Sequence, residues 1–118
     1  MKQELKNRTK RFALDIIRMT EFLPKKSVSW ILEKQIIRSS TSIGANYRAA
    51  LRGRSTAEFI AKLGIVEEEA DETCYWLELI DEASLIPSEK LLKLHKEADE
   101  LTAIFTAMVK TAKRNNSR

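Results

Sequence analysis

The chain has 118 residues, and 21 Lys and Arg against 17 Asp and Glu give it a net charge of +4. This length fits one domain, expected over residues 1–118, which buries roughly two-thirds of its unfolded surface without disulfides. The single Cys74 cannot form an internal bridge, no apolar run approaches the ~18 residues of a membrane span, and the N-terminus lacks a signal-peptide core. We therefore expect a cytoplasmic protein that does not contact membranes.

The first two predicted helices are separated by a proline. The first runs over about residues 5–23 and ends at Pro24. Its apolar stripe has three-and-four spacing and consists of Leu5, Phe12, Ile16, Met19 and Leu23. The second covers residues 27–52, with Ser27 as its cap and Gly53 as the left-handed residue that closes it.

The third predicted helix covers residues 55–84 and stops before Pro87. Ser55 and Glu58 have the spacing of a capping box, in which each side chain satisfies a free backbone amide of the other residue. Its inner stripe is Phe59, Leu63, Val66, Ala70, Thr73, Leu77 and Ile80. The sequence thus predicts a third amphipathic helix with a defined start.

The fourth predicted helix covers residues 88–113, with Ser88 as its cap and a frayed tail from Lys113. Its stripe keeps heptad order and consists of Leu91, Leu94, Ala98, Leu101, Phe105, Met108 and Ala112. Long helices joined by short turns lie antiparallel to their neighbours. The fold class predicted is therefore all-α, an antiparallel up-down-up-down four-helix bundle.

Two of these helices carry more apolar surface than one core uses. On the second, apolar or small residues recur at intervals of seven, and on the third a second set lies opposite the inner stripe. Surplus apolar stripes usually mark contacts between subunits. We expect a homo-oligomer whose interface contains Trp30, Ile37, Gly44, Leu51, Ile65, Trp76 and Leu79.

Residues 35–47 put small and polar side chains in the middle of the second helix, where a core helix usually carries Leu. The hydroxyls of residues 39–42 suggest a nucleophile, but no histidine can be assigned to activate one. The better interpretation is close helix packing, with the hydroxyls bonded back to the preceding turn. Catalysis is not expected, and we classify the chain as a non-enzyme.

Acidic residues gather on the third helix, at Glu67, Glu68, Glu69, Asp71 and Glu72. Bundles can hold two metal ions between Glu-x-x-His pairs, but this chain has one histidine, His95, and no such pair. A solvated or ion-paired acidic face and an edge-of-core histidine are the favoured interpretations. We expect no metal and no cofactor.

Charge is uneven along the sequence, because residues 1–55 hold 13 Lys and Arg against 4 Asp and Glu, while residues 56–118 hold 8 against 13. Four cations of the second helix fall within about 80° of its circumference: Lys34, Arg38, Arg48 and Arg52. Arg54 extends this stripe, and Arg11 and Arg18 lie one heptad apart on the first helix. These cations either pair with the acidic third helix, within the chain or between subunits, or form a positive surface for phosphates.

Several segments together carry a recognisable pattern: residues 8–13, 23–24, 35–47, 54–60 and 69–77. Within them, Arg-Ser-Ser-Thr-Ser-Ile-Gly-Ala-Asn-Tyr and Glu-Thr-Cys-Tyr-Trp-Leu are the most specific. The pattern resembles the four-helix-bundle proteins encoded within intervening sequences of bacterial 23S ribosomal RNA genes. One departure is Ala50, which follows Arg48 and Ala49 near where relatives are expected to carry a glutamate.

The resemblance implies a bundle that assembles into a ring, a pentamer, and no established catalytic residues. It also implies similarity to the accessory proteins of diversity-generating retroelements, which bind a reverse transcriptase and nucleic acid.

The leading hypothesis is a non-enzymatic oligomeric module whose basic face contacts structured RNA or another nucleic acid, with RNA the favoured ligand over DNA. Its candidate phosphate contacts are Lys34, Arg48, Arg52, Arg54, Arg11 and Arg18. The alternative is an adaptor that docks a protein partner such as a reverse transcriptase and has no nucleic-acid role. Salt discriminates the two, because phosphate contacts weaken steeply with salt and an apolar surface does not.

Overall fold

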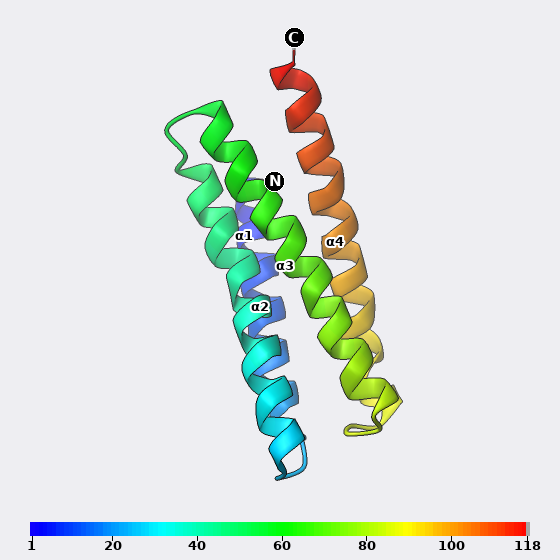
Figure 1. Cartoon of the computed structure of the whole chain (residues 1–118). Coiled ribbons are helices and arrows are strands. Elements are labelled where there is room, and N and C mark those ends of the chain that lie inside the picture. The colour runs from blue at the N-terminus through cyan, green and yellow to red at the C-terminus, as the bar shows by residue number, and fades with distance from the viewer. Residues whose placement is uncertain (118) are drawn as a thin grey trace.

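The computed structural model describes residues 1–117 and shows four α-helices joined by short turns (Figure 1). They are α1 (Lys2–Thr20), α2 (Ser27–Leu51), α3 (Thr56–Glu82) and α4 (Ser88–Asn116). Successive helices run antiparallel, and the bundle measures 51 × 22 × 20 Å along its principal axes. The predicted up-down-up-down bundle is confirmed. No helix in the described part is both long and apolar enough to cross a lipid bilayer.

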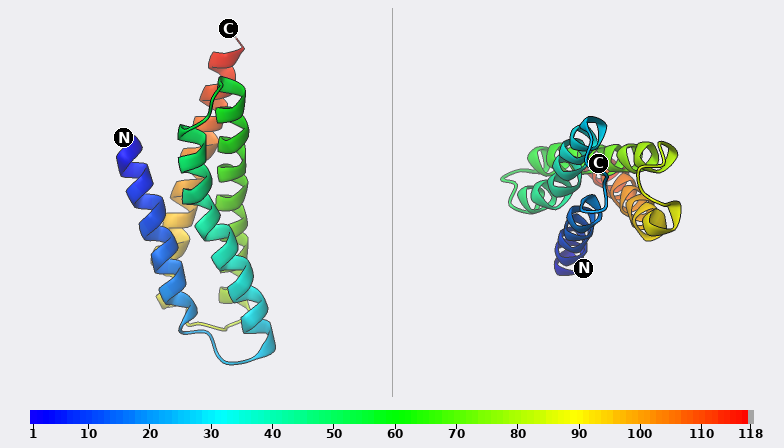
Figure 2. Two further views of the ribbon diagram at one scale, coloured as in Figure 1. Left: turned by 90° about the vertical axis from the view of Figure 1, so that its left-hand side faces the viewer. Right: turned by 90° about the horizontal axis from the view of Figure 1, so that it is seen from below.

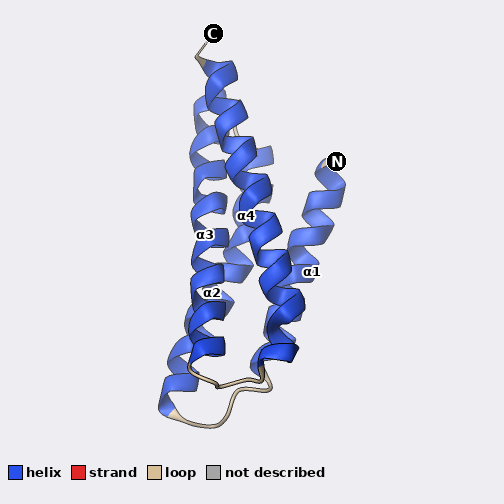
Figure 3. Cartoon of the chain, turned by 90° about the vertical axis from the view of Figure 1, so that its right-hand side faces the viewer, coloured by secondary structure: helices blue, strands red, loops and turns tan. Residues whose placement is uncertain are grey.

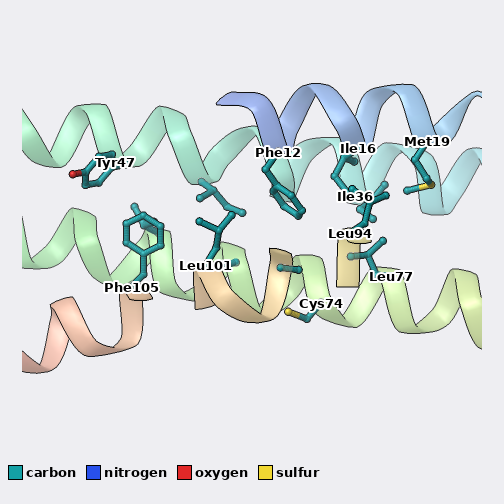
Figure 4. Close-up of a cluster of buried hydrophobic side chains, with 14 of the residues drawn as sticks. Phe12, Ile16, Met19, Ile36, Tyr47, Cys74, Leu77, Leu94, Leu101 and Phe105 are labelled. Atoms are coloured by element: carbon teal, nitrogen blue, oxygen red, sulfur yellow. The ribbon is translucent and has the colours of Figure 1, made fainter. Parts of the chain in front are cut away.

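The core runs along the whole bundle, because each helix turns its three-and-four stripe inward (Figure 4). Phe12, Ile36 and Leu101 are almost fully buried, and the rings of Tyr47 and Phe105 meet edge to face with centroids 5.4 Å apart. Burial of each such side chain stabilises the fold by about 1.5–3 kcal/mol. The inner stripes were predicted correctly except near the helix ends, where Leu23, Phe59, Met108 and Ala112 are only half-buried.

The two ends of α1 differ from the prediction. The helix begins at Lys2 and ends at Thr20 rather than Leu23. The amides of Glu21, Phe22 and Leu23 each donate to the carbonyl three residues back, which tightens the chain into a turn. At the other end of the molecule, α4 continues to Asn116, so the tail predicted to fray from Lys113 is helical.

Only one of the three predicted serine caps is observed. Ser55 precedes α3, and its hydroxyl accepts a hydrogen bond from the Glu58 amide at 3.1 Å, which is one half of the predicted capping box. The reciprocal bond from the Ser55 amide to the Glu58 carboxylate is not found within residues 1–117. Ser27 and Ser88 are instead the first helical residues, because the extended residues before them, Lys26 and Pro87, occupy the cap positions. The Ser88 hydroxyl donates to the Asp81 carboxylate at 2.5 Å and ties α4 to α3.

The prediction that Gly53 adopts a left-handed conformation is wrong. Within residues 1–117 the positive φ belongs to Ser84, at 56°, in the α3–α4 connection. Gly53 is needed for space: a Cβ there would lie 3.0 Å from the Ala50 carbonyl oxygen and 3.2 Å from the Phe59 nitrogen. The glycine lets the start of α3 fold tightly against the end of α2.

The bundle has two distinct ends. The α1–α2 and α3–α4 connections lie together at one end (Figure 3). The α2–α3 connection and both chain termini lie toward the other end, where the start of α1 diverges from the other helices (Figure 2, left). Arg8 nevertheless links α1 to α4, because its Nε and Nη2 atoms each lie 2.7 Å from a carboxylate oxygen, of Glu97 and Glu100 respectively.

Candidate nucleic-acid interface

The end of the bundle near the termini is strongly basic, and we call it the basic end. It consists of residues 1–11, 45–62 and 103–117, which are the start of α1, the α2–α3 connection with its flanking turns, and the end of α4. Its acidic residues are Glu4 and Glu58 alone. Its twelve cations are Lys2, Lys6, Arg8, Lys10, Arg11, Arg48, Arg52, Arg54, Lys62, Lys110, Lys113 and Arg114.

The remainder of the described chain has the opposite balance, with 15 Asp and Glu against 8 Lys and Arg in residues 12–44 and 63–102. Charge is therefore separated along the long axis of the bundle. The antiparallel topology causes this separation, because it places the basic start of α1 and the basic end of α2 beside the end of α4. Sequence reasoning missed eight of the twelve cations, including Lys110, Lys113 and Arg114 of α4. For these three the available signal was that no acidic residue follows Glu100 in α4.

The structure brings four of the six predicted phosphate contacts to the basic end. Arg11, Arg48, Arg52 and Arg54 are all exposed there. Lys34 is exposed in the first half of α2, away from this end. Arg18 lies near the end of α1, and its Nη1 is 3.3 Å from the Asp15 carboxylate within the same helix.

Arg38 is the cation for which pairing with the acidic third helix is confirmed. Its guanidinium lies 3.0 Å from the Glu69 carboxylate and also contacts that of Glu72. The pair fixes Arg38 against α3 and removes it from the basic stripe. Within residues 1–117, no ion pair forms at the other stripe cations or at Arg11.

The hydroxyls in the middle of α2 serve helix packing, as predicted. Ser39 is fully buried, and its hydroxyl lies 2.8 Å from that of Thr73 across the α2–α3 contact. Thr41 and Ser42 each donate to the carbonyl oxygen four residues earlier, at 2.7 Å. These bonds satisfy the hydroxyls without a catalytic partner.

Gly44 is packed by its own chain. A Cβ at this position would lie 3.1 Å from the Thr9 hydroxyl, so the close approach for which we predicted a subunit seam is made by α1. Of the other predicted interface residues, Trp30 is 65% exposed and Ile65 is 39% exposed. Ile37, Leu51, Trp76 and Leu79 are half-buried.

The potentially reactive side chains sit in protected positions. Burial raises the pKa of the Cys74 thiol to about 11, so at neutral pH it stays protonated beside Asp99 and Thr102. His95 lies at the core edge, with its Nε2 3.3 Å from the Asp81 carboxylate. Within residues 1–117, no three His, Cys, Asp or Glu side chains are grouped as a metal site.

A groove of about 1000 Å³ opens at the basic end, between the start of α1, the α2–α3 connection and the end of α4. Its walls are mostly apolar and include Leu5, Tyr47, Ala50, Leu51, Phe59, Ile104 and Met108. Lys2, Arg8, Arg11 and Arg54 also line it, together with the acidic Glu4, and give it a mainly cationic border. The groove exists where α1 diverges from the rest of the bundle.

Comparisons with known proteins agree with the fold. The family model for the 23S rRNA-intervening sequence protein matches residues 1–107. A crystal structure of a protein of unknown function from the S23 ribosomal protein family of Bacteroides thetaiotaomicron is 37% identical and superposes with a TM-score of 0.82. The match covers 89% of this chain and 97% of that one. No curated protein matched the chain.

Proposed function

The chain belongs to the 23S rRNA-intervening sequence protein family, and we propose that it is a non-enzymatic module that binds structured RNA through its basic end. The family description and the relative indicate no enzyme family. The description also names a place in ribosomal RNA genes rather than a chemistry. The proposal therefore rests on the charge of this molecule.

The supporting observation is the gathering of twelve cations against two carboxylates at one end of the bundle, where, within residues 1–117, only Arg8 among these cations is ion-paired. Arg48 and Arg52 are exposed there and make no ion pair within residues 1–117. Exposed guanidinium groups bind phosphate oxygens and release condensed counterions, which gives affinity that does not depend on base sequence. Several strands or turns of one RNA fold can contact such an end at once.

Charge reversal at the basic end tests the proposal. In Arg48→Glu/Arg52→Glu, affinity for a labelled RNA hairpin is expected to fall at least about tenfold, and the slope of log K against log salt is expected to shrink by roughly 2. Fluorescence anisotropy across a salt series, with an equal-length DNA duplex in parallel, measures both quantities.

The matched control is Lys25→Glu/Lys26→Glu, which makes the same change of charge at exposed residues of the opposite end. Its affinity is expected to fall much less than that of the arginine variant. Equal losses in the two variants would show that net charge alone governs binding. Absence of RNA binding by the wild-type protein at low salt would refute the proposal and leave protein docking as the remaining function.

We further propose that the protein acts as a homo-oligomer. The supporting observation is the exposure of adjacent large apolar side chains near the start of α2, where Trp30 is 65% and Ile31 is 62% exposed. Large exposed apolar groups of this kind commonly mark protein contacts. Because this surface lies at the opposite end of α2 from Arg48 and Arg52, assembly through it leaves the basic end open.

A further inference from the structure

We infer that the groove at the basic end receives the base of one unpaired RNA nucleotide, while the arginines at its border hold the adjoining phosphates. This inference rests on the proposed RNA binding and names the part of the RNA that is recognised. It is carried by Tyr47, by the apolar walls of the groove and by the placement of Arg11 and Arg54 at its border.

Tyr47 presents a polar atom that the protein itself does not satisfy. The residue is 1% exposed, and its side chain makes none of the hydrogen bonds found within residues 1–117. Within residues 1–117, the Tyr47 oxygen lacks a hydrogen bond but is not fully enclosed, so a small part of it reaches the surface. The hydroxyl therefore opens onto the groove that Tyr47 lines.

Figure 4 shows how the ring is held. Tyr47 packs against Phe105, and its oxygen points along the bundle away from the core side chains of Phe12 and Leu101. Burial raises the pKa of Tyr47, so the hydroxyl stays protonated and can both donate and accept a hydrogen bond. A fixed hydroxyl at the floor of an apolar groove favours a ligand that carries a polar group deep inside.

The walls suit a flat, largely apolar body. Leu5, Ala50 and Ile104 supply aliphatic surface, and the half-buried ring of Phe59 lies on the α3 side. A nucleobase combines apolar faces with polar edges, so its faces contact these walls while an edge reaches Tyr47. An alkyl chain would leave the tyrosine hydroxyl without a partner, and this difference favours the base.

The border of the groove suits the phosphates on either side of such a base. Arg11 and Arg54 come from α1 and from the α2–α3 connection, and both are exposed. Arg8 is held in place by Glu97 and Glu100, hydrogen bonds that raise its pKa and partly neutralise it. We therefore assign the phosphate contacts to Arg11 and Arg54, and a structural role to Arg8.

Recognition of this kind requires a nucleotide that is already unpaired. Proteins that read RNA sequence act mainly on loops and bulges, whose bases can leave the stack without breaking a helix. The basic end would then hold the flanking double-stranded segments through their phosphates. This division separates affinity, which the cations supply, from preference for a bulge, which the groove supplies.

The test compares two hairpins that are identical except at a single bulged position, which carries adenine in one and an abasic sugar in the other. Wild-type full-length protein is expected to bind the adenine bulge about tenfold more tightly. Tyr47→Phe is expected to reduce this ratio by at least about twofold while the affinity for the abasic hairpin is unchanged. The matched control is Tyr75→Phe, which removes the same atom from an exposed tyrosine of α3 and should preserve the ratio.

A second readout follows the base itself. When 2-aminopurine replaces the bulged adenine, binding of the wild-type protein is expected to change the fluorescence of the 2-aminopurine. In a separate measurement, Arg54→Gln should weaken binding of the adenine and abasic hairpins equally, because both keep the phosphates that Arg54 contacts. The inference would be overturned if the wild-type protein bound the two hairpins equally, or if Tyr47→Phe kept the full preference for adenine. In either case, affinity that falls steeply with salt would still support RNA binding. If neither hairpin binds at low salt, the proposed function and this inference both fail.

Discussion

At the scale of single residues, Gly44 and Gly64 occupy helices in the same way but meet different surroundings. A Cβ at Gly44 would press on the Thr9 hydroxyl at 3.1 Å, whereas a Cβ at Gly64 would meet nothing within 4 Å. Glycine inside a helix costs about 0.5–1 kcal/mol relative to alanine. The packing of α1 against α2 therefore offsets this cost at Gly44 and not at Gly64.

We predict that Gly44→Leu lowers the free energy of unfolding by about 1–3 kcal/mol, because the larger side chain forces α1 away from α2. Gly64→Ala, the matched control, is expected to raise it by about 0.5–1 kcal/mol through helix propensity. Urea titrations followed by circular dichroism measure both changes. A Gly44→Leu protein as stable as the wild type would contradict the close contact with α1.

The sequence predicted that some element approaches Gly44 closely, because small residues replace Leu in the middle of a helix. It named the wrong element, a second subunit, since the position of Gly44 on the helix surface is equally consistent with α1 and with a second subunit. The same limit applies to Gly53, where a glycine after a helix indicates a tight turn but not the sign of φ. Tyr47 was predicted only as part of a motif, because an unsatisfied hydroxyl is visible only when its neighbours are placed.

At the scale of secondary-structure elements, α1 is the helix least surrounded by the others. It is the shortest of the four, and its start diverges from the bundle beside the groove (Figure 2). The ion pair of Arg8 with Glu97 and Glu100 joins this diverging segment to α4. The groove therefore depends on how firmly the start of α1 is held.

We predict that Arg8→Met speeds amide hydrogen exchange in residues 2–12 and leaves exchange in the middle of α3 unchanged. The expected loss of stability is about 0.5–1 kcal/mol, because the carboxylates and the arginine remain partly solvated. The control is Arg18→Met, which removes an exposed pair within α1 and should alter exchange little. Unchanged exchange at the start of α1 in Arg8→Met would show that apolar packing alone holds this segment.

Helix number, order and inner faces could be predicted because apolar periodicity reports directly which side of a helix is buried. Helix ends could not be placed as well. Ser27 and Ser88 have the residue type of a cap, yet the extended residues before them take that role. A preferred residue at the N-cap stabilises a helix by only about 1 kcal/mol. The geometry of the preceding connection can therefore decide which of two adjacent residues becomes the cap.

At the scale of the whole molecule, the exposed apolar surface near the start of α2 bears on assembly. We predict that the wild-type protein is a homo-oligomer by native mass spectrometry and that Trp30→Glu shifts it toward the monomer, because a buried carboxylate is costly. Leu92→Glu is the control, since Leu92 is 64% exposed on α4 and lies outside the predicted interface. A wild-type monomer at micromolar concentration would contradict the proposal.

The sequence shows a basic first half and an acidic second half, but in the structure the charge is separated along the long axis of the bundle. The last turns of α4 join the basic start of α1 and the basic end of α2, so the acidic half of the sequence contributes cations to the basic end. Only the antiparallel arrangement brings these distant segments together. The cations that α2 contributes to the candidate interface could therefore be predicted from the sequence. Those of α4 could not, because only the folded structure shows that the end of α4 lies beside them.

The separation of charge along a 51 Å axis makes the molecule a permanent electric dipole. The backbone dipoles of antiparallel helices largely cancel, so the side chains set its direction. A polyanion that approaches from any side exerts a torque that turns the positive pole toward it before contact. Encounters thereby become oriented, and the association rate constant, more than the lifetime of the complex, should depend on ionic strength.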